Sequence, residues 1–214
     1  MPQTEGVSAV EPFGLPLAPE NEAGRTGRVA AGCVFWGLAA AEEFSTVAED
    51  HANCSAGSVT HGFKTVAEVV GNDDIRELLG SGWVDEAAFG ALPVVASRPE
   101  AVVYGPLAST TLKPDVVMVT INARALMTLK DAVPDLSVEG KPQCHIIAMA
   151  KEQGSIAASV GCALSRARTG MSADQMTCAI PASVLPHLLD RLEREDKVNS
   201  LMARYAGVDA RRFA

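Results

Sequence analysis

The sequence is poor in aromatic residues and in positive charge. Of its 214 residues only 5% are Phe, Trp or Tyr, and 26 acidic residues outweigh 18 basic ones, which leaves a formal net charge of −8. No run of Lys and Arg interrupts this acidic balance. A protein whose main partner is nucleic acid needs a basic surface to meet the phosphates. The composition therefore predicts no nucleic-acid partner.

Long apolar segments are also missing. No stretch approaches the roughly 20 apolar residues that a helix needs to cross a bilayer. The first thirty residues contain Pro, Glu and Gly in place of the continuous apolar core of a signal peptide. The 5 cysteines are odd in number, which argues against a framework of disulfides. We therefore expect no membrane association and a reducing, cytoplasmic location.

Several common site motifs are absent as well. The glycines form neither a G-x-G-x-x-G fingerprint nor a Walker loop, so no nucleotide site is predicted. There is no G-x-S-x-G nucleophile elbow and no closely spaced C-x-x-C pair of the kind that marks a zinc knuckle. Any site must therefore be assembled from residues that are distant in the sequence.

One pattern that is present places a cysteine, seven residues and a glycine in order. It occurs as Cys54 to Gly62 and again as Cys162 to Gly170, and Cys33 follows a comparable small-residue approach, Ala-Ala-Gly. We predict that each cysteine begins a short helix and that the glycine ends it. A helix N-terminus carries unpaired N–H groups and partial positive charge, which bias a thiol there toward the thiolate.

The remaining chain alternates between helical and extended patterns. Hydrophobic residues make up 48% and charged residues 21%, a balance typical of globular proteins. Apolar runs and caps predict an α/β fold, with an α+β arrangement as the alternative. The predicted strands are 44–48, 101–107, 115–121, 155–160 and 175–180, and the predicted helices are 33–44, 54–60, 73–79, 85–92, 123–132, 143–152, 184–194 and 197–205.

The order of these elements also predicts the domain organisation. Residues 1–24 form a Pro-rich, partly disordered lead-in, and residues 25–214 form a single domain. A strand, a helix entry residue and an amphipathic helix occur at 115–132 and again at 175–194, each preceded by one cysteine pattern. We therefore expect two similar strand–helix units with a cysteine loop in each half. The corresponding halves are 25–135 and 136–214.

The three cysteines Cys33, Cys54 and Cys162 are the predicted site. Three thiolates with an open fourth position suit a [4Fe-4S] cluster whose remaining iron binds a substrate, and they also suit zinc. We favour the cluster because soft sulfur ligands and a reducing compartment are what it requires. Cys144 and Cys178 lie inside apolar runs and are expected to be buried core residues.

Three further residues complete the predicted site. His51 and His61 flank Cys54, where either could move a proton or act as a fourth ligand. Arg166 lies four residues after Cys162, on the same helical face, where it would hold a carboxylate or phosphate. The predicted reaction is a non-redox elimination, hydration or desulfuration of a small anionic substrate.

Two other functions fit the same residues. The first is an enzyme without metal, in which Cys54 or Cys162 is a covalent nucleophile and His61 its base. The second is a non-catalytic protein that binds a metal or cofactor, or a homodimeric binding module. This second alternative predicts an exposed apolar face on the helix 197–205.

The ordered set of motifs resembles a known family. The set consists of Cys33 opening a helix, Asn53-Cys54, Gly105-Pro106-Leu107, Pro114-Asp115-Val116-Val117 before Asn122, Ser159-Val160-Gly161-Cys162 before Arg166, and Met176 through Pro181. It resembles the domain of unknown function 169, or ArCR-like, proteins over about residues 25–195. The resemblance implies a single-domain prokaryotic cytoplasmic protein with its motif cysteines at positions 33, 54 and 162, and it implies no reaction. The Pro-rich lead-in and the Ala-Leu pair after Cys162 depart from the family pattern.

Overall fold

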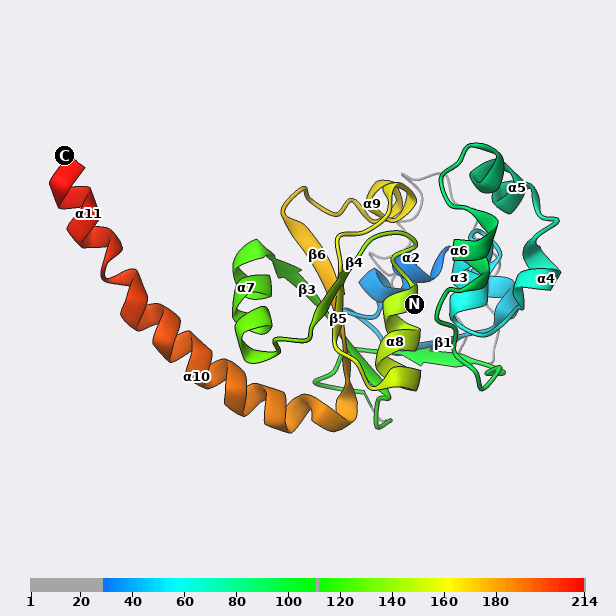
Figure 1. Ribbon diagram of the computed structural model, residues 1–214. Helices are drawn as coiled ribbons and strands as arrows, with labels where there is room; N and C mark the ends of the chain where they lie inside the picture. Colours follow the sequence, from blue (N-terminus) through cyan, green and yellow to red (C-terminus); the bar gives the residue numbers. More distant parts are fainter. Residues whose placement is uncertain (1–28, 111, 214) are drawn as a thin grey trace.

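A computed structural model describes residues 29–110 and 112–213, so the predicted lead-in over residues 1–24 lies outside the described residues. The described chain contains both helices and strands (Figure 1). In chain order they are α2 (Gly32–Leu38), β1 (Phe44–Thr46), the 3-10 helix η2 (Ala48–His51), α3 (Ser55–Thr60), α4 (Val66–Val69), α5 (Asp73–Gly80), α6 (Glu86–Gly90), β2 (Val102–Tyr104), β3 (Val116–Asn122), α7 (Ala123–Ala132), β4 (Ser137–Glu139), α8 (His145–Gln153), β5 (Ala157–Ser159), α9 (Ala163–Thr169), β6 (Gln175–Pro181), η3 (Ala182–Val184), α10 (Leu185–Ala203) and α11 (Ala206–Phe213). None of the described helices combines the length and apolarity that a membrane span requires.

The main sheet has four strands in the order β3-β6-β5-β4. The central strand β6 is antiparallel to β3 over seven residues, from Val116 opposite Pro181 to Asn122 opposite Gln175, and it is also antiparallel to β5. Only β4 and β5 run parallel. A smaller sheet pairs β1 with β2. This mixture of helices and sheets confirms the predicted α/β class.

Both faces of the main sheet are covered by helices. Val117 and Ile121 of β3 point to one face, where they pack with Leu129 of α7 and Leu188 of α10. The alternate position Val116 packs on the other face with α8 (Figure 1). Because successive residues of β3 point to opposite covered faces, nearly all of its positions are apolar in the sequence.

A second, mainly helical part lies beside the sheet on the α8 side (Figure 1). Helices α3, α5 and α6 share a small core that includes Val59, Ile75 and Phe89. Next to it, Phe35 of α2 packs with Phe44 of β1 and Tyr104 of β2. Because α8 and α3 are in contact, the helical part is joined directly to the sheet.

The structure does not confirm a repeated unit. The pairs β3–α7 and β6–α10 are neighbours, but α7 has 10 residues and α10 has 19. The segment from Cys54 to Gly62 is separated from β3 by α4, α5, α6 and β2, whereas the segment from Cys162 to Gly170 leads directly into β6. The sequence similarity therefore reflects two cap-and-helix patterns and not a shared architecture.

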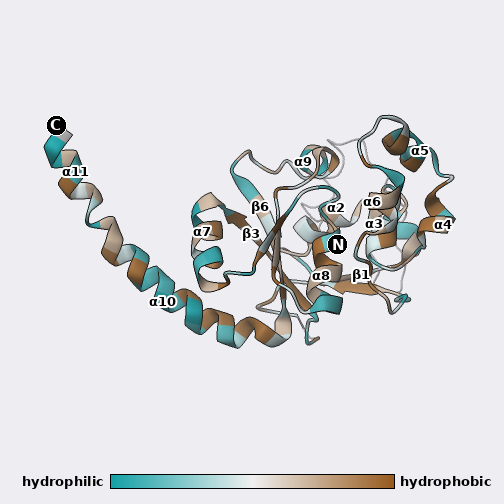
Figure 2. Cartoon of the chain, in the orientation of Figure 1, coloured by the Kyte–Doolittle hydropathy of each residue, from teal (hydrophilic) through white to brown (hydrophobic). Residues whose placement is uncertain are grey.

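The C-terminal helix is longer than the sequence predicts. The expected helices 184–194 and 197–205 are joined in the single helix α10, because the intervening residues 194–197 contain neither Gly nor Pro. Beyond α7 this helix leaves the body of the molecule (Figure 1) and carries hydrophobic residues among hydrophilic ones along its length (Figure 2). Three hydrophobic residues near its C-terminal end and one aromatic residue just after it are about half exposed. They are Val198, Leu201, Met202 and Tyr205.

Candidate functional site

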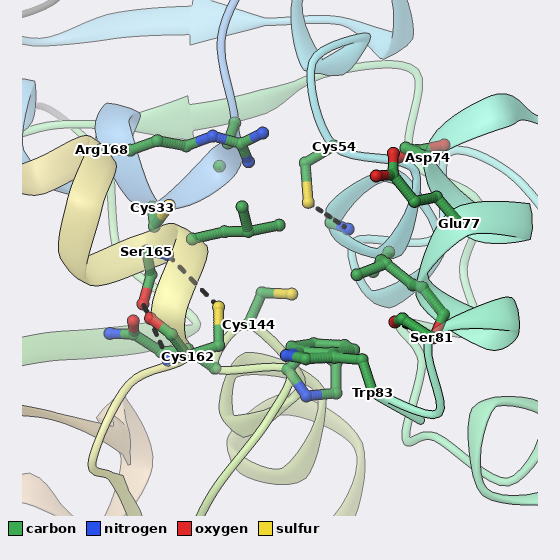
Figure 3. A pocket seen from close by; sticks show the side chains of 18 residues that line it. Cys33, Cys54, Asp74, Glu77, Ser81, Trp83, Cys144, Cys162, Ser165 and Arg168 are labelled. Carbon is green, nitrogen blue, oxygen red and sulfur yellow. Dashed lines mark hydrogen bonds between the residues drawn. The ribbon is translucent and has the colours of Figure 1, made fainter. Parts of the chain in front are cut away.

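One cavity of about 340 Å³ lies where the helical part meets the sheet, among α2, α3, α5, α8 and α9. Four cysteines line it: Cys33, Cys54, Cys144 and Cys162 (Figure 3). Its volume falls at the lower end of the roughly 300–1,000 Å³ usual for small-molecule sites. The structure thus brings the three cysteines of the sequence prediction to one place and adds a fourth.

Each of the four cysteines stands at the start of a helix. Cys54 and Cys162 are the N-caps of α3 and α9, and each sulfur accepts a backbone N–H, from Gly57 at 3.4 Å and from Ser165 at 3.3 Å. Cys33 is the second residue of α2, and Cys144 is the N-cap residue of α8 without a capping side-chain bond. The sulfurs are therefore positioned by helix starts that converge on the cavity.

The glycines end these helices as predicted. Gly62 follows α3 with φ +80°, and Gly170 caps α9 in the left-handed conformation with φ 63°. Both values lie in the region that glycine adopts without steric cost. The residue before the cap, Asn53, is a common capping type but does not cap α3. Its side-chain amide donates instead to the carbonyl of Val29.

Burial decides the protonation of the thiols. It raises the pKa of Cys33 to about 12, and the neighbouring Cys54 and Cys162 add to the shift. Burial also raises the pKa of Cys54, although the N–H of Gly57 and the charge of Arg168 act in the opposite direction. The expected bias toward thiolate at a helix start is thus present at Cys54 but is outweighed by desolvation. At neutral pH, Cys33 and Cys54 of the unliganded cavity are therefore thiols.

Cys144 is buried as expected, and it also lines the cavity. Its side chain is 8% exposed and lines the cavity, because α8 begins one residue later, at His145, and the cap position faces the cavity. The other cysteine expected in the core, Cys178, is fully buried among the apolar residues between the sheet and α7, as predicted.

The two predicted histidines lie behind the cavity wall and do not line it. His51 and His61 are buried with ring centroids 5.0 Å apart. The Nε2 atom of His51 is hydrogen-bonded to Thr46 Oγ1 at 2.9 Å, and Nδ1 of His61 donates to the carbonyl of Gly57 at 2.8 Å. Desolvation lowers the pKa of His51 to about 2 and also lowers the pKa of His61.

Gly32 separates this histidine pair from the cavity. A Cβ atom at Gly32 would stand 2.7 Å from Cε1 and 3.2 Å from Nε2 of His61, and 3.5 Å from Nδ1 of His51. These two ring nitrogens have no hydrogen-bond partner among the described residues. The close packing of Gly32 on the rings lets the next residue, Cys33, reach the cavity.

Two arginines of α9 have different tasks. Arg166 donates to the backbone carbonyls of Val160, Ser172 and Gln175 at 2.9–3.0 Å and does not line the cavity. Arg168 does line it, donates to the carbonyl of Asn53 at 2.9 Å, and lowers the pKa of Cys54 through its charge and a hydrogen bond. The arginine placed to meet a bound anion is therefore Arg168, and Arg166 ties α9 to the neighbouring loops.

Comparison with known families identifies the chain. A family model described as the uncharacterised ArCR, or domain of unknown function 169, family matches residues 10–191. The chain belongs to this family. No curated protein and no solved structure matches it. The ArCR match includes all four cavity cysteines and ends within α10, before the part of that helix that leaves the body.

The opposite wall of the ArCR cavity comes from α5 and the segment after it. Asp74 lines this wall, but its carboxylate accepts from both the backbone N–H and the hydroxyl of Ser55, so it also fastens α5 to α3. Glu77 and Trp83 complete the wall (Figure 3). Gln143 also lines the cavity and is 2% exposed, and its Oε1 has no hydrogen-bond partner among the described residues. Sequence patterns gave no signal for this wall, because it depends on how α5 packs.

The donor groups of the cavity can be tested against a single metal ion and against a cluster. Within residues 29–110 and 112–213, no three His, Cys, Asp or Glu side chains are placed to hold one ion. Zinc at about 2.3 Å from each sulfur would need the sulfurs within about 4 Å of one another. A four-iron cluster has a separate iron for each cysteine, so its ligands stand further apart. The cavity offers several sulfur donors, the ligand type that a four-iron cluster takes.

Proposed function

We propose that this chain is a cytoplasmic iron–sulfur protein in which Cys33, Cys54 and Cys162 hold a [4Fe-4S] cluster. One observation carries the proposal: three partly exposed free cysteines from three separate helix starts line one cavity. Soft sulfur donors are the ligands that such clusters take in proteins. A reducing compartment would keep the same cysteines available as thiols.

The proposed reaction is a non-redox lyase, hydratase or desulfurase reaction on a small anionic substrate. A bound cluster would supply a Lewis-acidic iron. The chain would supply the rest of the binding site. Arg168 brings its positive charge to the cavity, with one N–H fixed on Asn53, and is suited to a carboxylate or phosphate of the substrate. The buried Oε1 of Gln143 would accept a hydrogen bond from a hydroxyl or amine of the same molecule.

The apolar lining supports a substrate site at the same place. Leu78, Trp83 and Leu164 line the cavity together with the cysteines. Apolar walls around a few polar groups limit access of water and strengthen the interaction between Arg168 and a bound anion. The substrate class that fits is therefore a small acid with one hydrogen-bond donor, a partly apolar body and an oxygen or sulfur that can bind iron.

The metal-free alternative has less support. Burial raises the pKa of Cys54, and Nδ1 of the proposed base His61 is already bonded to the carbonyl of Gly57. A nucleophilic cysteine needs a base within hydrogen-bond reach or a lowered thiol pKa. Labelling of a single thiol by iodoacetamide, with loss of activity in metal-free protein, would favour this alternative over the cluster.

The test is anaerobic purification followed by reconstitution with iron and sulfide. We expect about four irons and four sulfides per chain and a broad visible absorption. Replacement of Cys33, Cys54 or Cys162 by Ala should abolish or destabilise the cluster, and Cys178→Ala should not, because Cys178 lies in the core away from the cavity. Wild-type protein that takes up neither iron nor the visible absorption would overturn the proposal.

A further inference from the structure

The fourth cysteine of the cavity differs from the other three in its depth. Cys33, Cys54 and Cys162 are partly exposed, whereas Cys144 is 8% exposed. It enters the cavity from the start of α8, the helix that covers the main sheet, and in the close view it faces the same space as Cys54 and Cys162 (Figure 3). A ligand in the cavity would therefore contact Cys144 on its inner side.

Cys144 packs differently from the other buried cysteine, Cys178. Although buried, it belongs to none of the apolar clusters formed by the described residues, whereas Cys178 packs among the side chains beneath the sheet. The surroundings of Cys144 are the residues of the cavity wall.

All four cysteines line the same cavity, although they come from four different helix starts. Four thiolates crowded into an apolar cavity would repel one another strongly, and a positively charged metal core is the group that would compensate them.

We propose that Cys144 is a fourth cysteine ligand of the cluster in the resting protein, an inference that rests on the proposed function. When a cluster binds, Cys144 would lose its thiol proton to solvent and would supply the fourth sulfur ligand. A substrate would then have to displace Cys144, which would take up a proton again. The site would thus be closed until substrate arrives.

Oxidation distinguishes a closed cluster from an open one. A four-iron cluster whose fourth iron has no protein ligand loses that iron on mild oxidation, and the three-iron product gives a characteristic electron paramagnetic resonance signal. Wild type, Cys144→Ala, Cys144→Ser and the control Cys178→Ala would be reconstituted anaerobically and treated with ferricyanide. The serine variant preserves the side-chain volume, so it provides a folded sample if the alanine variant fails to fold.

We expect wild type and Cys178→Ala to keep all their iron and to remain without the three-iron signal. Each Cys144 variant should lose about one iron per cluster and give the signal. If wild type loses iron as readily as the variants, Cys144 is not a ligand, although the three-cysteine cluster stands. If neither wild type nor variant loses iron, the inference is also overturned. Wild type that never binds a cluster removes the proposed function first, and the inference with it.

Discussion

At Gly32 the chain leaves no room for a side chain. Because a Cβ there would lie 2.7 Å from Cε1 of His61, Gly32→Ala must push apart α2 and the buried rings. We expect a loss of about 1–3 kcal/mol in the free energy of unfolding, measured by urea denaturation. Cluster uptake should fall as well, because Cys33 is the next residue.

The matched control is Gly37→Ala in the same helix, where no atom lies within 4 Å of the added Cβ. That variant should gain roughly 0.5–1 kcal/mol, and equal effects of the two would contradict this packing.

The buried histidine pair should make stability depend on pH. In the folded protein burial lowers the pKa of His51 to about 2 and lowers that of His61, while both titrate near 6.5 when unfolded. The unfolded state therefore binds more protons as the pH falls below about 6.5, and the stabilising effect present above that pH is lost. Well below pH 6.5, His51 should contribute up to about 1.4 kcal/mol per pH unit, and His61 should add to the slope in the same direction.

Urea denaturation between pH 7 and pH 5 measures this slope. His51→Gln should remove its share of the slope, whatever its effect on stability at pH 7. The exposed His187 supplies the control, because His187→Gln should leave the slope as it is in wild type. An unchanged slope in His51→Gln would mean that the pair is accessible to protons in the folded state.

Helix α9 contains two arginines with different roles. Arg166 is structural and Arg168 lines the cavity, and single substitutions distinguish the two roles. Arg166→Ala removes three hydrogen bonds to backbone carbonyls and should lower the free energy of unfolding by about 1–3 kcal/mol. Arg168→Ala should affect stability less and chemistry more. Without its charge the pKa of Cys54 rises further, so alkylation of Cys54 by iodoacetamide in cluster-free protein at pH 8 should slow about threefold or more.

Mass spectrometry of the Cys54 peptide measures the alkylation rate. Arg168→Lys keeps the positive charge and should react at a rate between those of wild type and Arg168→Ala. The assignment of Arg168 to the site would be wrong if its removal left the rate unchanged, or if Arg166→Ala slowed alkylation equally in protein that is still folded.

Local signals account for the elements that the sequence predicted well. Helix α7 has the predicted bounds because Asn122 Oδ1 accepts the N–H of Ala125 and fixes the start. Strand β4 carries no such signal. It has three residues, and only pairing with β5 and the bond from the Val160 N–H to the carbonyl of Glu139 make it a strand. Tertiary contacts of this kind cannot be read from local patterns.

The same distinction holds for the site. Cys33, Cys54 and Cys162 were identified because small residues and glycines mark short helices around them. Cys144 and Arg168 were missed because their directions depend on where α8 begins and how α9 packs against the loop before α3. Cys144 lies two residues after Pro142 and directly before a helix, so its cap position was the one local signal that could have indicated it.

On the scale of the whole molecule, the cavity lies at the interface between the helical part and the main sheet. Cys33 and Cys54 come from the helical part, and Cys144 and Cys162 come from helices connected to the main sheet. Arg168 of α9 connects the two parts directly, because it donates a hydrogen bond to the carbonyl of Asn53. A cluster bound by all these sulfurs would therefore also fasten the two parts together, and its loading should raise the thermal stability of the protein.

The C-terminal end of the molecule should be separable from this assembly. After Leu188, no residue that the structure describes is buried, and the family match ends at residue 191. Deletion of residues 204–214 should therefore change the free energy of unfolding by less than about 0.5 kcal/mol and leave cluster uptake intact.

Leu188→Ala, by contrast, should cost about 2–5 kcal/mol, because Leu188 packs in the core of the sheet. Urea denaturation of the two variants and iron analysis of the deletion measure both effects. A deletion that destabilised the protein as much as Leu188→Ala would show that the C-terminal segment packs against the body, or against another chain, in solution.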